Sequence, residues 1–215
     1  MKTEVDHLVV AAASLDEGVA WCETTLGITP GPGGRHALMG THNRLFSIAS
    51  DAFPGAYFEI IAIDPEAPAP QQRRRWFALD DAVPRPPRLV HLVARTRAMD
   101  MHRWGLVNLG LDPGLPVAAS RDTPHGRLSW QIMLRDDGAL LAGGALPTLI
   151  QWQGPHPTER MPDSGVRLRA LQLGGLGGPV QQLLQLHGAT HAAAPPAIRA
   201  VLDTPLGPVT LETAA

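Results

Sequence analysis

Residues 5–10 read VDHLVV and residues 89–94 read LVHLVA, two apolar stretches that each hold one central histidine. A helical pattern follows each stretch, and the two patterns end alike, in LGITPG at residues 26–31 and in LGLDPG at residues 109–114. A strand-like segment, a helix and a matching terminus that recur in one chain indicate an internal repeat. The repeat is the feature that determines the expected fold.

The spacing inside the two copies supports this interpretation. His7 lies 20 positions before Gly27 (27 − 7), and His91 lies 19 positions before Gly110 (110 − 91). The two intervals therefore agree to within one residue. Repeated units of this kind stack so that each covers the apolar face of the other.

Each copy predicts one strand, one helix and three further strands. In the first copy, Ser14 and Glu17 form a capping box at the start of the helix, and Gly27 supplies the left-handed residue that ends it. The second helix is expected near residues 98–109. Further strands are expected near residues 37–39, 44–49 and 56–63 in the first copy and near 116–120, 127–135 and 146–153 in the second.

A third segment, at residues 166–213, predicts a strand, a helix at Pro179–His187 and two more strands. We therefore expect an α+β fold in which repeated βαβββ modules form a curved mixed sheet around a concave site. The expected organisation is a domain at residues 1–160, with modules at about 4–66 and 86–157. A reduced third βαββ module at residues 161–215 would serve packing or dimerisation, so that a homodimer is one expected form of the protein.

The composition is that of an ordinary globular protein, with 44% hydrophobic and 18% charged residues in 215. A net charge of −2 argues against nucleic acid and anionic membranes as partners. The single cysteine, Cys22, allows neither an intrachain disulfide nor a cysteine-based zinc site. No apolar run approaches the roughly 20 residues that span a bilayer, and the acidic N-terminus is not a signal peptide. A cytoplasmic location is therefore expected.

The two repeated histidines point to a shared site. The last strand of the first module carries Glu59 among apolar residues, where an unpaired carboxylate is costly to bury. Equivalent positions in two modules come together, so His7, His91 and Glu59 suit a divalent ion such as Zn, Ni, Co, Mn or Fe, with the Gln151 oxygen and water completing the shell. The alternative is a polar cavity without a metal. It is kept because a lone histidine on an apolar face is usually a hydrogen-bonded core residue and not a metal ligand.

Two glycine-rich loops and one tryptophan supply candidates for substrate binding. The loops GGRH at 33–36 and GTHN at 40–43 hold Arg35, His36 and Asn43, which could reach the mouth of the site. Plain turn chemistry explains the same loops equally well. Trp130 could be a platform for a ligand, although a tryptophan on a strand is more often part of the core.

Several of these motifs occur in the order of a known family. DHLVV, the Leu-Gly that ends the first helix, GGRH, GTHN, YFEIIAIDP and LPTLIQW resemble the glyoxalase-like domain family of the vicinal oxygen chelate superfamily, over roughly residues 4–157. The resemblance implies metal ligands on the first and last strands of paired modules, at His7, Glu59, His91 and Gln151. A glutamate is expected where this chain has Gln151, which leaves Glu59 as the one carboxylate.

The resemblance also implies an activity. A metal that chelates two adjacent oxygens of a small molecule would act as a Lewis acid in a lyase or isomerase reaction, with Glu59 as the catalytic base. Two alternatives stay open. His7, His91 and Glu59 could form the two-histidine, one-carboxylate triad of an Fe(II)-dependent dioxygenase. The chain could also be a metal-free protein that binds a small molecule.

Overall fold

Both repeated segments fold as a strand, a helix and three strands. The structure is a computed structural model that describes residues 2–81, 86–123 and 126–214. The first module consists of β1 (Glu4–Ala11), α1 (Leu15–Leu26), β2 (Arg35–His36), β3 (Thr41–Ser47) and β4 (Tyr57–Ile63). The second module consists of β5 (Arg88–Arg95), α2 (Met99–Asn108), β6 (Leu115–Thr123), β7 (Gly126–Leu134) and β8 (Thr148–Gln153).

Local signals in the sequence set the ends of the two helices. The Ser14 side chain accepts a hydrogen bond from the backbone N–H of Glu17 at the start of α1, over 3.2 Å. Gly27 ends α1 with φ of 72°, and Gly110 follows α2 with φ of 78°, a left-handed conformation that favours glycine. The expected helix boundaries are therefore confirmed.

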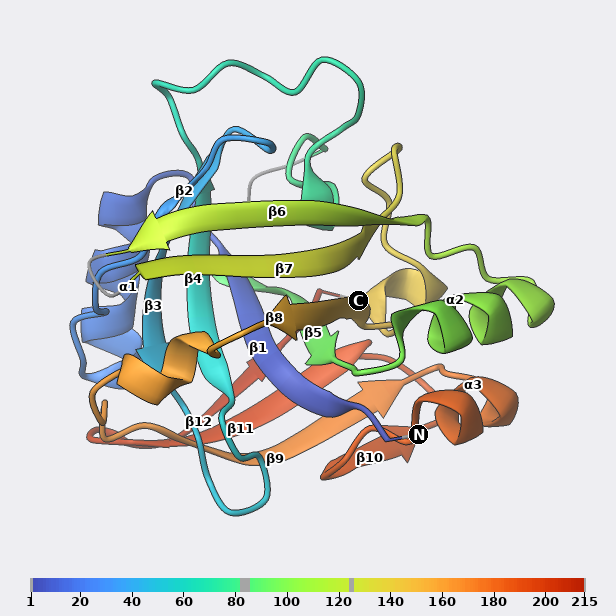
Figure 1. The fold of residues 1–215 in the computed structure, drawn as a ribbon. Helices are drawn as coiled ribbons and strands as arrows, with labels where there is room; N and C mark the ends of the chain where they lie inside the picture. The colour runs from blue at the N-terminus through green and yellow to red at the C-terminus, as the bar shows by residue number, and fades with distance from the viewer. Residues whose placement is uncertain (1, 82–85, 124–125, 215) are drawn as a thin grey trace.

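The two modules share one curved mixed sheet. Its eight strands run in the order β2-β3-β4-β1-β5-β8-β7-β6. Within each module the first strand pairs in parallel with the last, β1 with β4 and β5 with β8, and the antiparallel pair β1–β5 joins the modules. The sheet curls until β6 and β7 cross in front of β1 and β4 (Figure 1). The predicted concave face is the inside of this curl.

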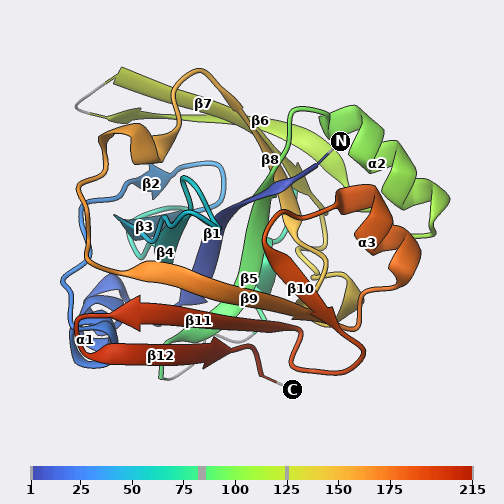
Figure 2. The same ribbon diagram turned by 90° about the horizontal axis from the view of Figure 1, so that it is seen from below.

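The third module forms a second, four-stranded sheet. It contains β9 (Arg167–Gly174), α3 (Gly178–Leu184), β10 (Ala189–Ala192), β11 (Ile198–Thr204) and β12 (Gly207–Glu212), in the order β10-β9-β11-β12. The short strand β10, absent from the sequence expectation, pairs in parallel with β9 directly after the helix. In the third module the first strand therefore pairs in parallel with the strand directly after the helix, whereas in the first two modules it pairs in parallel with the last strand. Figure 1 shows the small sheet below the large one, and Figure 2 shows α3 beside α2.

The core has two parts, one on each face of the large sheet. Leu8 and Phe58 face the small sheet and pack in one apolar cluster with Leu168 and Leu202 of that sheet. The concave face holds a second cluster that includes Val9. A one-turn helix of the connection between the modules, η1 (Trp76–Ala78), inserts the side chains of Trp76 and Phe77 into this second cluster. These two aromatic side chains pack against the concave face of the large sheet.

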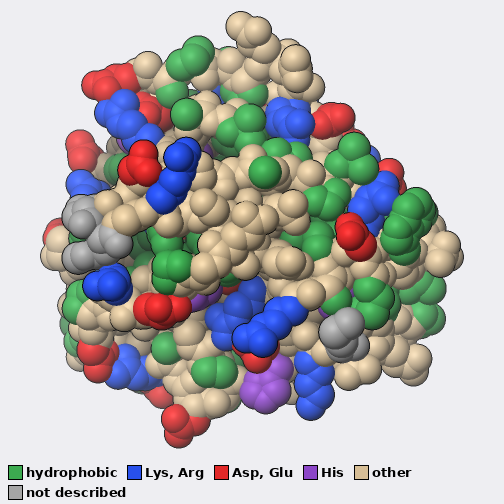
Figure 3. Space-filling view, in the orientation of Figure 1, with side chains coloured by type: hydrophobic (Ala, Val, Ile, Leu, Met, Phe, Trp, Pro, Cys, Tyr) green, Lys and Arg blue, Asp and Glu red, His purple; other side chains and the backbone are tan. Residues whose placement is uncertain are grey.

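The outer surface carries mixed charge. On the face seen in Figure 3, Lys and Arg side chains are interspersed with Asp and Glu side chains. Many are paired, as in the contact of Arg95 with Glu4. Within the described part of the chain, no helix is both long and apolar enough to span a membrane.

Candidate active site

The site begins with an irregularity in β1. In the pairing of β1 with β5, Val5 lies opposite Ala94 and His7 lies opposite Val93, so that Asp6 is an extra residue. A bulge of this kind redirects a side chain that regular alternation would send to the other face of the sheet. As a result, Oδ1 of Asp6 lies 2.7 Å from Nδ1 of His7. Two neighbouring residues of one strand thus form a hydrogen-bonded pair.

Asp6 is completely buried, and several side chains surround its carboxylate. Besides His7, the indole Nε1–H of Trp152 donates to Oδ2 over 2.8 Å, and Nε2 of His156 lies 3.0 Å from the same oxygen. Burial alone would raise the pKa of Asp6. The hydrogen bonds with His156 and His7 outweigh burial and hold the pKa well below its usual value. Asp6 is therefore a buried anion.

Glu59 of β4 faces the other ring nitrogen of His7. Its Oε2 lies 3.3 Å from Nε2 of His7, and its Oε1 accepts a hydrogen bond of 2.6 Å from Nδ2 of Asn43. Burial would raise the pKa of Glu59, but the hydrogen bond and the charge of His7 lower it to about 2. Burial likewise opposes charge on His7, whereas Asp6 and Glu59 raise its pKa to about 9. An imidazolium therefore lies between two carboxylates.

Asn43 connects Glu59 to the rim of the site. Its Oδ1 accepts hydrogen bonds from the backbone N–H of Gly34, over 2.8 Å, and from Nη1 of Arg121, over 3.2 Å. Nε2 of His36 lies 3.3 Å from Nδ2 of Asn43, and burial lowers the pKa of His36 to about 4, which keeps the ring neutral. Arg35 points away from these groups, with a mostly exposed side chain beside two carboxylates of the first module.

These side chains surround a small cavity of about 30 Å³. A space of this size holds roughly one or two water molecules. The wall is largely aromatic, and Tyr57 stacks on His7 with ring centroids 4.5 Å apart. The lining side chains come from both modules and from η1: His7, His36, Asn43, Tyr57, Glu59, Trp76, Phe77, Arg121, Trp130, Ile132, Ile150 and Trp152.

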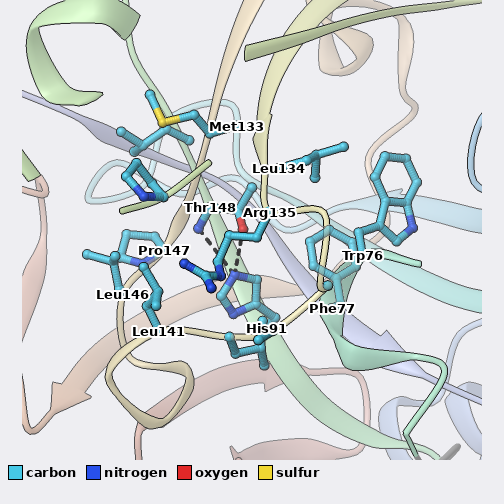
Figure 4. Close-up of a pocket in the computed structure, with 15 residues that line it drawn as sticks. Trp76, Phe77, His91, Met133, Leu134, Arg135, Leu141, Leu146, Pro147 and Thr148 are labelled. Carbon is cyan, nitrogen blue, oxygen red and sulfur yellow. Dashed lines mark hydrogen bonds between the residues drawn. The ribbon is translucent and has the colours of Figure 1, made fainter. Parts of the chain in front are cut away.

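His91 lies in a separate cavity of about 40 Å³, whose wall also includes Phe77. Nε2 of His91 accepts a hydrogen bond from the backbone N–H of Thr148 over 3.2 Å and lies 2.9 Å from the Thr148 hydroxyl (Figure 4). Burial lowers the pKa of His91 to about 3, so the ring is neutral. Phe77 borders both cavities, and its ring lies 5.4 Å from that of His91.

Gln151 points to the opposite face of the sheet. Its neighbours Ile150 and Trp152 both line the small cavity, and successive side chains of a strand alternate between faces. Accordingly, Oε1 of Gln151 accepts a hydrogen bond of 3.3 Å from the backbone N–H of Met99, at the start of α2. The amide thus helps to cap a helix.

Comparison with known proteins identifies the family. Residues 5–178 match the model of a family described as a glyoxalase-like domain. The chain belongs to this family. Among curated proteins, none matches it. The glyoxalase-like chain is similar to several solved structures at low identity, and such a likeness shows the fold alone where the TM-score is above 0.5. A hypothetical protein from Staphylococcus aureus is 14% identical, with a TM-score of 0.58 over 99% of this chain and 86% of that one. A methylmalonyl-CoA epimerase from Mycobacterium tuberculosis is 18% identical, with a TM-score of 0.42 over 71% and 89%.

The superfamily implies a divalent metal, but the four expected ligands do not fit one ion here. His7 and Glu59 are in contact, whereas Nε2 of His91 is bonded to Thr148 and the Gln151 amide lies on the far face. In the part of the chain that the structure describes, no three His, Cys, Asp or Glu side chains form a group able to hold a metal. We therefore derive no chemical step through a metal in this glyoxalase-like protein.

Three site residues were not identified from the sequence: Asp6, Trp152 and His156. Asp6 left one signal, an acidic residue directly before His7 in an otherwise apolar strand. Trp152 and His156 reach the site through the curl of the sheet and through the segment after β8. No local pattern in the sequence marks them.

Proposed function

We propose that this glyoxalase-like protein is a lyase or isomerase that moves a proton on a small oxygenated molecule, with Glu59 as the acid–base group. The observation that carries the proposal is the contact of an ionised Glu59 with a protonated His7 in a small cavity whose wall contains five aromatic side chains. A base and an acid that lie side by side in opposite protonation states suit a proton shift between neighbouring atoms.

The proposed step uses both groups. Glu59 takes a proton from the carbon next to a carbonyl group, while Nε2–H of His7 gives its proton to the carbonyl oxygen. An enol forms, or an enediol where the substrate is an α-hydroxy carbonyl compound. Return of the proton from Glu59 to the neighbouring carbon or to the opposite face completes an isomerisation, whereas departure of a leaving group with its electron pair from the adjacent carbon completes an elimination. Asp6, hydrogen-bonded to Nδ1, keeps His7 oriented and stabilises its positive charge before the transfer.

The low pKa of Glu59 is compatible with this role. A pKa of about 2 makes a weak base, but the hydrogen bond and the charge of His7 are the main causes that lower it. When His7 passes its proton to the substrate oxygen, that charge disappears and the affinity of Glu59 for a proton rises. The two transfers therefore assist each other, and they are favourable only when they are coupled.

A metal-free binding protein is the second candidate. It is favoured by one observation, a groove of about 540 Å³ that adjoins the site and is much larger than the inner cavity. The Fe(II)-dependent dioxygenase hypothesis has less support, because it requires two histidines and a carboxylate around one ion, and His91 is hydrogen-bonded elsewhere.

Solvent exchange tests the proposal. The protein is incubated in D₂O with α-hydroxy ketones, 2-oxo aldehydes and 2-substituted 3-oxo acids, and deuterium incorporation at carbon is followed by NMR. We expect exchange with at least one class, and a loss of about 100-fold or more in Glu59→Gln. Glu66→Gln is the matched control, because Glu66 is an exposed carboxylate paired with Arg35. Ligand binding without any exchange would favour the binding protein instead.

A further inference from the structure

A groove of about 540 Å³ adjoins the site. It lies between the Ile28–Gly33 loop, β3, the joined ends of β6 and β7, and η3 (Pro157–Arg160). Figure 1 shows η3 beside the end of the β6–β7 pair, with β3 behind. Its volume is in the range of small-molecule sites, about 300–1,000 Å³. The two modules and the segment after β8 thus build one groove of a size that suits a small organic molecule.

Apolar side chains make up much of the wall of this groove. Leu45 and Phe46 of β3, Leu128 of β7 and Met161 after η3 all line it. The body of a ligand that contacts these side chains would therefore be apolar.

Three arginines give the groove an excess of positive charge. Arg121, Arg127 and Arg160 line it, together with one carboxylate, that of Asp163. Asp163 is neutralised by the two guanidinium nitrogens of Arg167, at 2.6 and 2.8 Å. Arg160 has no ion-pair partner among the residues that the structure describes, whereas Arg127 contacts Asp122 and Ser120. The groove therefore presents donors that an anion would satisfy.

Arg121 joins the groove to the inner cavity, since it lines both. Its Nη1 donates to Oδ1 of Asn43, whose Nδ2 donates to Glu59. His156 lines the groove as well and lies 3.0 Å from the buried Asp6. Arg121 itself is therefore two hydrogen bonds from Glu59.

We propose that the groove binds an amphipathic anion, a small molecule with a carboxylate or phosphate head at Arg121 and an apolar body along β3 and Met161. The proposal rests on the proposed function, since it names the substrate class of the same site. Guanidinium groups bind both head groups through paired N–H donors. The anion would fix the substrate so that the atoms next to its head group face Glu59.

Binding can be measured without activity. Isothermal titration calorimetry compares octanoate, octyl phosphate and octanol as probes, which share one apolar chain and differ in the head group. We expect at least one anion to bind tenfold or more tightly than octanol, and its affinity to fall as salt is raised from 50 to 500 mM. We expect Arg121→Gln to weaken anion binding by about tenfold or more, and Arg160→Gln by about threefold, with octanol binding unchanged.

Arg199→Gln is the control, because Arg199 lies on the small sheet beside Glu212 and outside the groove. Any one of three results would overturn the proposal. Octanol could bind as tightly as both anions, no probe could bind at millimolar concentration, or both groove variants could leave anion binding unchanged. The same titration with Glu59→Gln separates the two proposals. Anion binding retained in this variant, with no deuterium exchange in the wild-type protein, refutes the catalytic role alone.

Discussion

Nδ1 of His7 lies 2.7 Å from Oδ1 of Asp6, although the two residues are neighbours on one strand. Regular alternation would send the side chains to opposite faces of the sheet. The bulge at Asp6 brings them together, and it buries a carboxylate that holds His7 in its charged form. The charge state of the whole site therefore depends on one extra residue in β1.

The first prediction concerns the pKa of His7 after Asp6→Asn. Asp6 and Glu59 together raise this pKa to about 9, and the substitution removes one of the two carboxylates. We expect the pKa to fall by at least one unit, measured by NMR titration of the imidazole nitrogens, with the His7 signals assigned by their loss in His7→Gln. Asp51→Asn, which changes an exposed carboxylate, should leave the pKa unchanged. If the pKa of His7 is unchanged in Asp6→Asn, Asp6 does not hold His7 in its protonated form.

The second prediction is that the free energy of unfolding peaks near pH 6.5. The folded state keeps a proton on His7 up to a pH of about 9, whereas the unfolded chain releases it near 6.5, so stability falls as the pH rises between these values. Burial lowers the pKa of His36 to about 4 and that of His91 to about 3, so stability also falls as the pH drops below 6.5. Each such proton changes the free energy by about 1.4 kcal/mol per pH unit.

Urea unfolding at a series of pH values between 4 and 9.5 measures this curve. In His7→Gln we expect the alkaline decline to disappear and the acidic decline to remain. His187→Gln, at an exposed position, should keep both. A wild-type curve that is flat between pH 6.5 and 9 would contradict a charged His7 in the folded state.

Much of the fold was predictable because its signals are local or repeated. The caps at Ser14 and Gly27 fix α1, and the repeat implied that two βαβββ modules would share one sheet. The pairing of first and last strands also explains why His7 and Glu59 meet. On β1 and β4, Val9 lies beside Glu59, and His7 is two positions away on the same face.

The rest of the site depends on tertiary structure that no local pattern encodes. Asp6 reaches His7 only because of a bulge, and period-two alternation predicts the opposite. His91 does occupy the position equivalent to His7, but Phe77 of the connection between the modules inserts beside it and Thr148 binds its ring. Period-two alternation places Ile150 and Trp152 on one face of β8 and Gln151 on the other, but it does not say which of the two faces points into the site.

The third prediction concerns metal affinity. Since His91 and Gln151 are hydrogen-bonded away from Glu59, we expect His91→Ala and Gln151→Ala to bind Zn²⁺ and Ni²⁺ as the wild-type protein does. Competition with a chromogenic chelator measures the affinities, and elemental analysis of protein purified without an affinity tag measures the bound metal. Stoichiometric metal in the wild type that is lost in His91→Ala and in Glu59→Ala would show that the two residues converge on an ion, contrary to this expectation.

The fourth prediction tests the support of Glu59 through a glycine that touches neither His7 nor Glu59. A Cβ atom at Gly33 would overlap the backbone oxygen and Oδ1 of Asn43, so Gly33→Ala must displace Asn43. Asn43 donates the hydrogen bond of 2.6 Å to Glu59, and its loss should raise the pKa of Glu59 and weaken proton exchange. The overlap should also cost about 1–3 kcal/mol in the free energy of unfolding.

Gly178→Ala provides the matched control for this prediction. A Cβ at Gly178 meets no atom within 4 Å, and this residue opens α3, where alanine is well tolerated. Its free energy of unfolding should change by no more than about 0.5 kcal/mol.

Deuterium exchange and urea unfolding are measured on both variants. If Gly33→Ala lowers stability but leaves exchange at the wild-type rate, Glu59 does not need Asn43 for catalysis. If both variants match the wild type in stability and exchange, the Gly33 loop yields without displacing Asn43. A loss of exchange in Gly33→Ala alone ties the activity to the hydrogen bond between Asn43 and Glu59, because neither catalytic side chain has been altered.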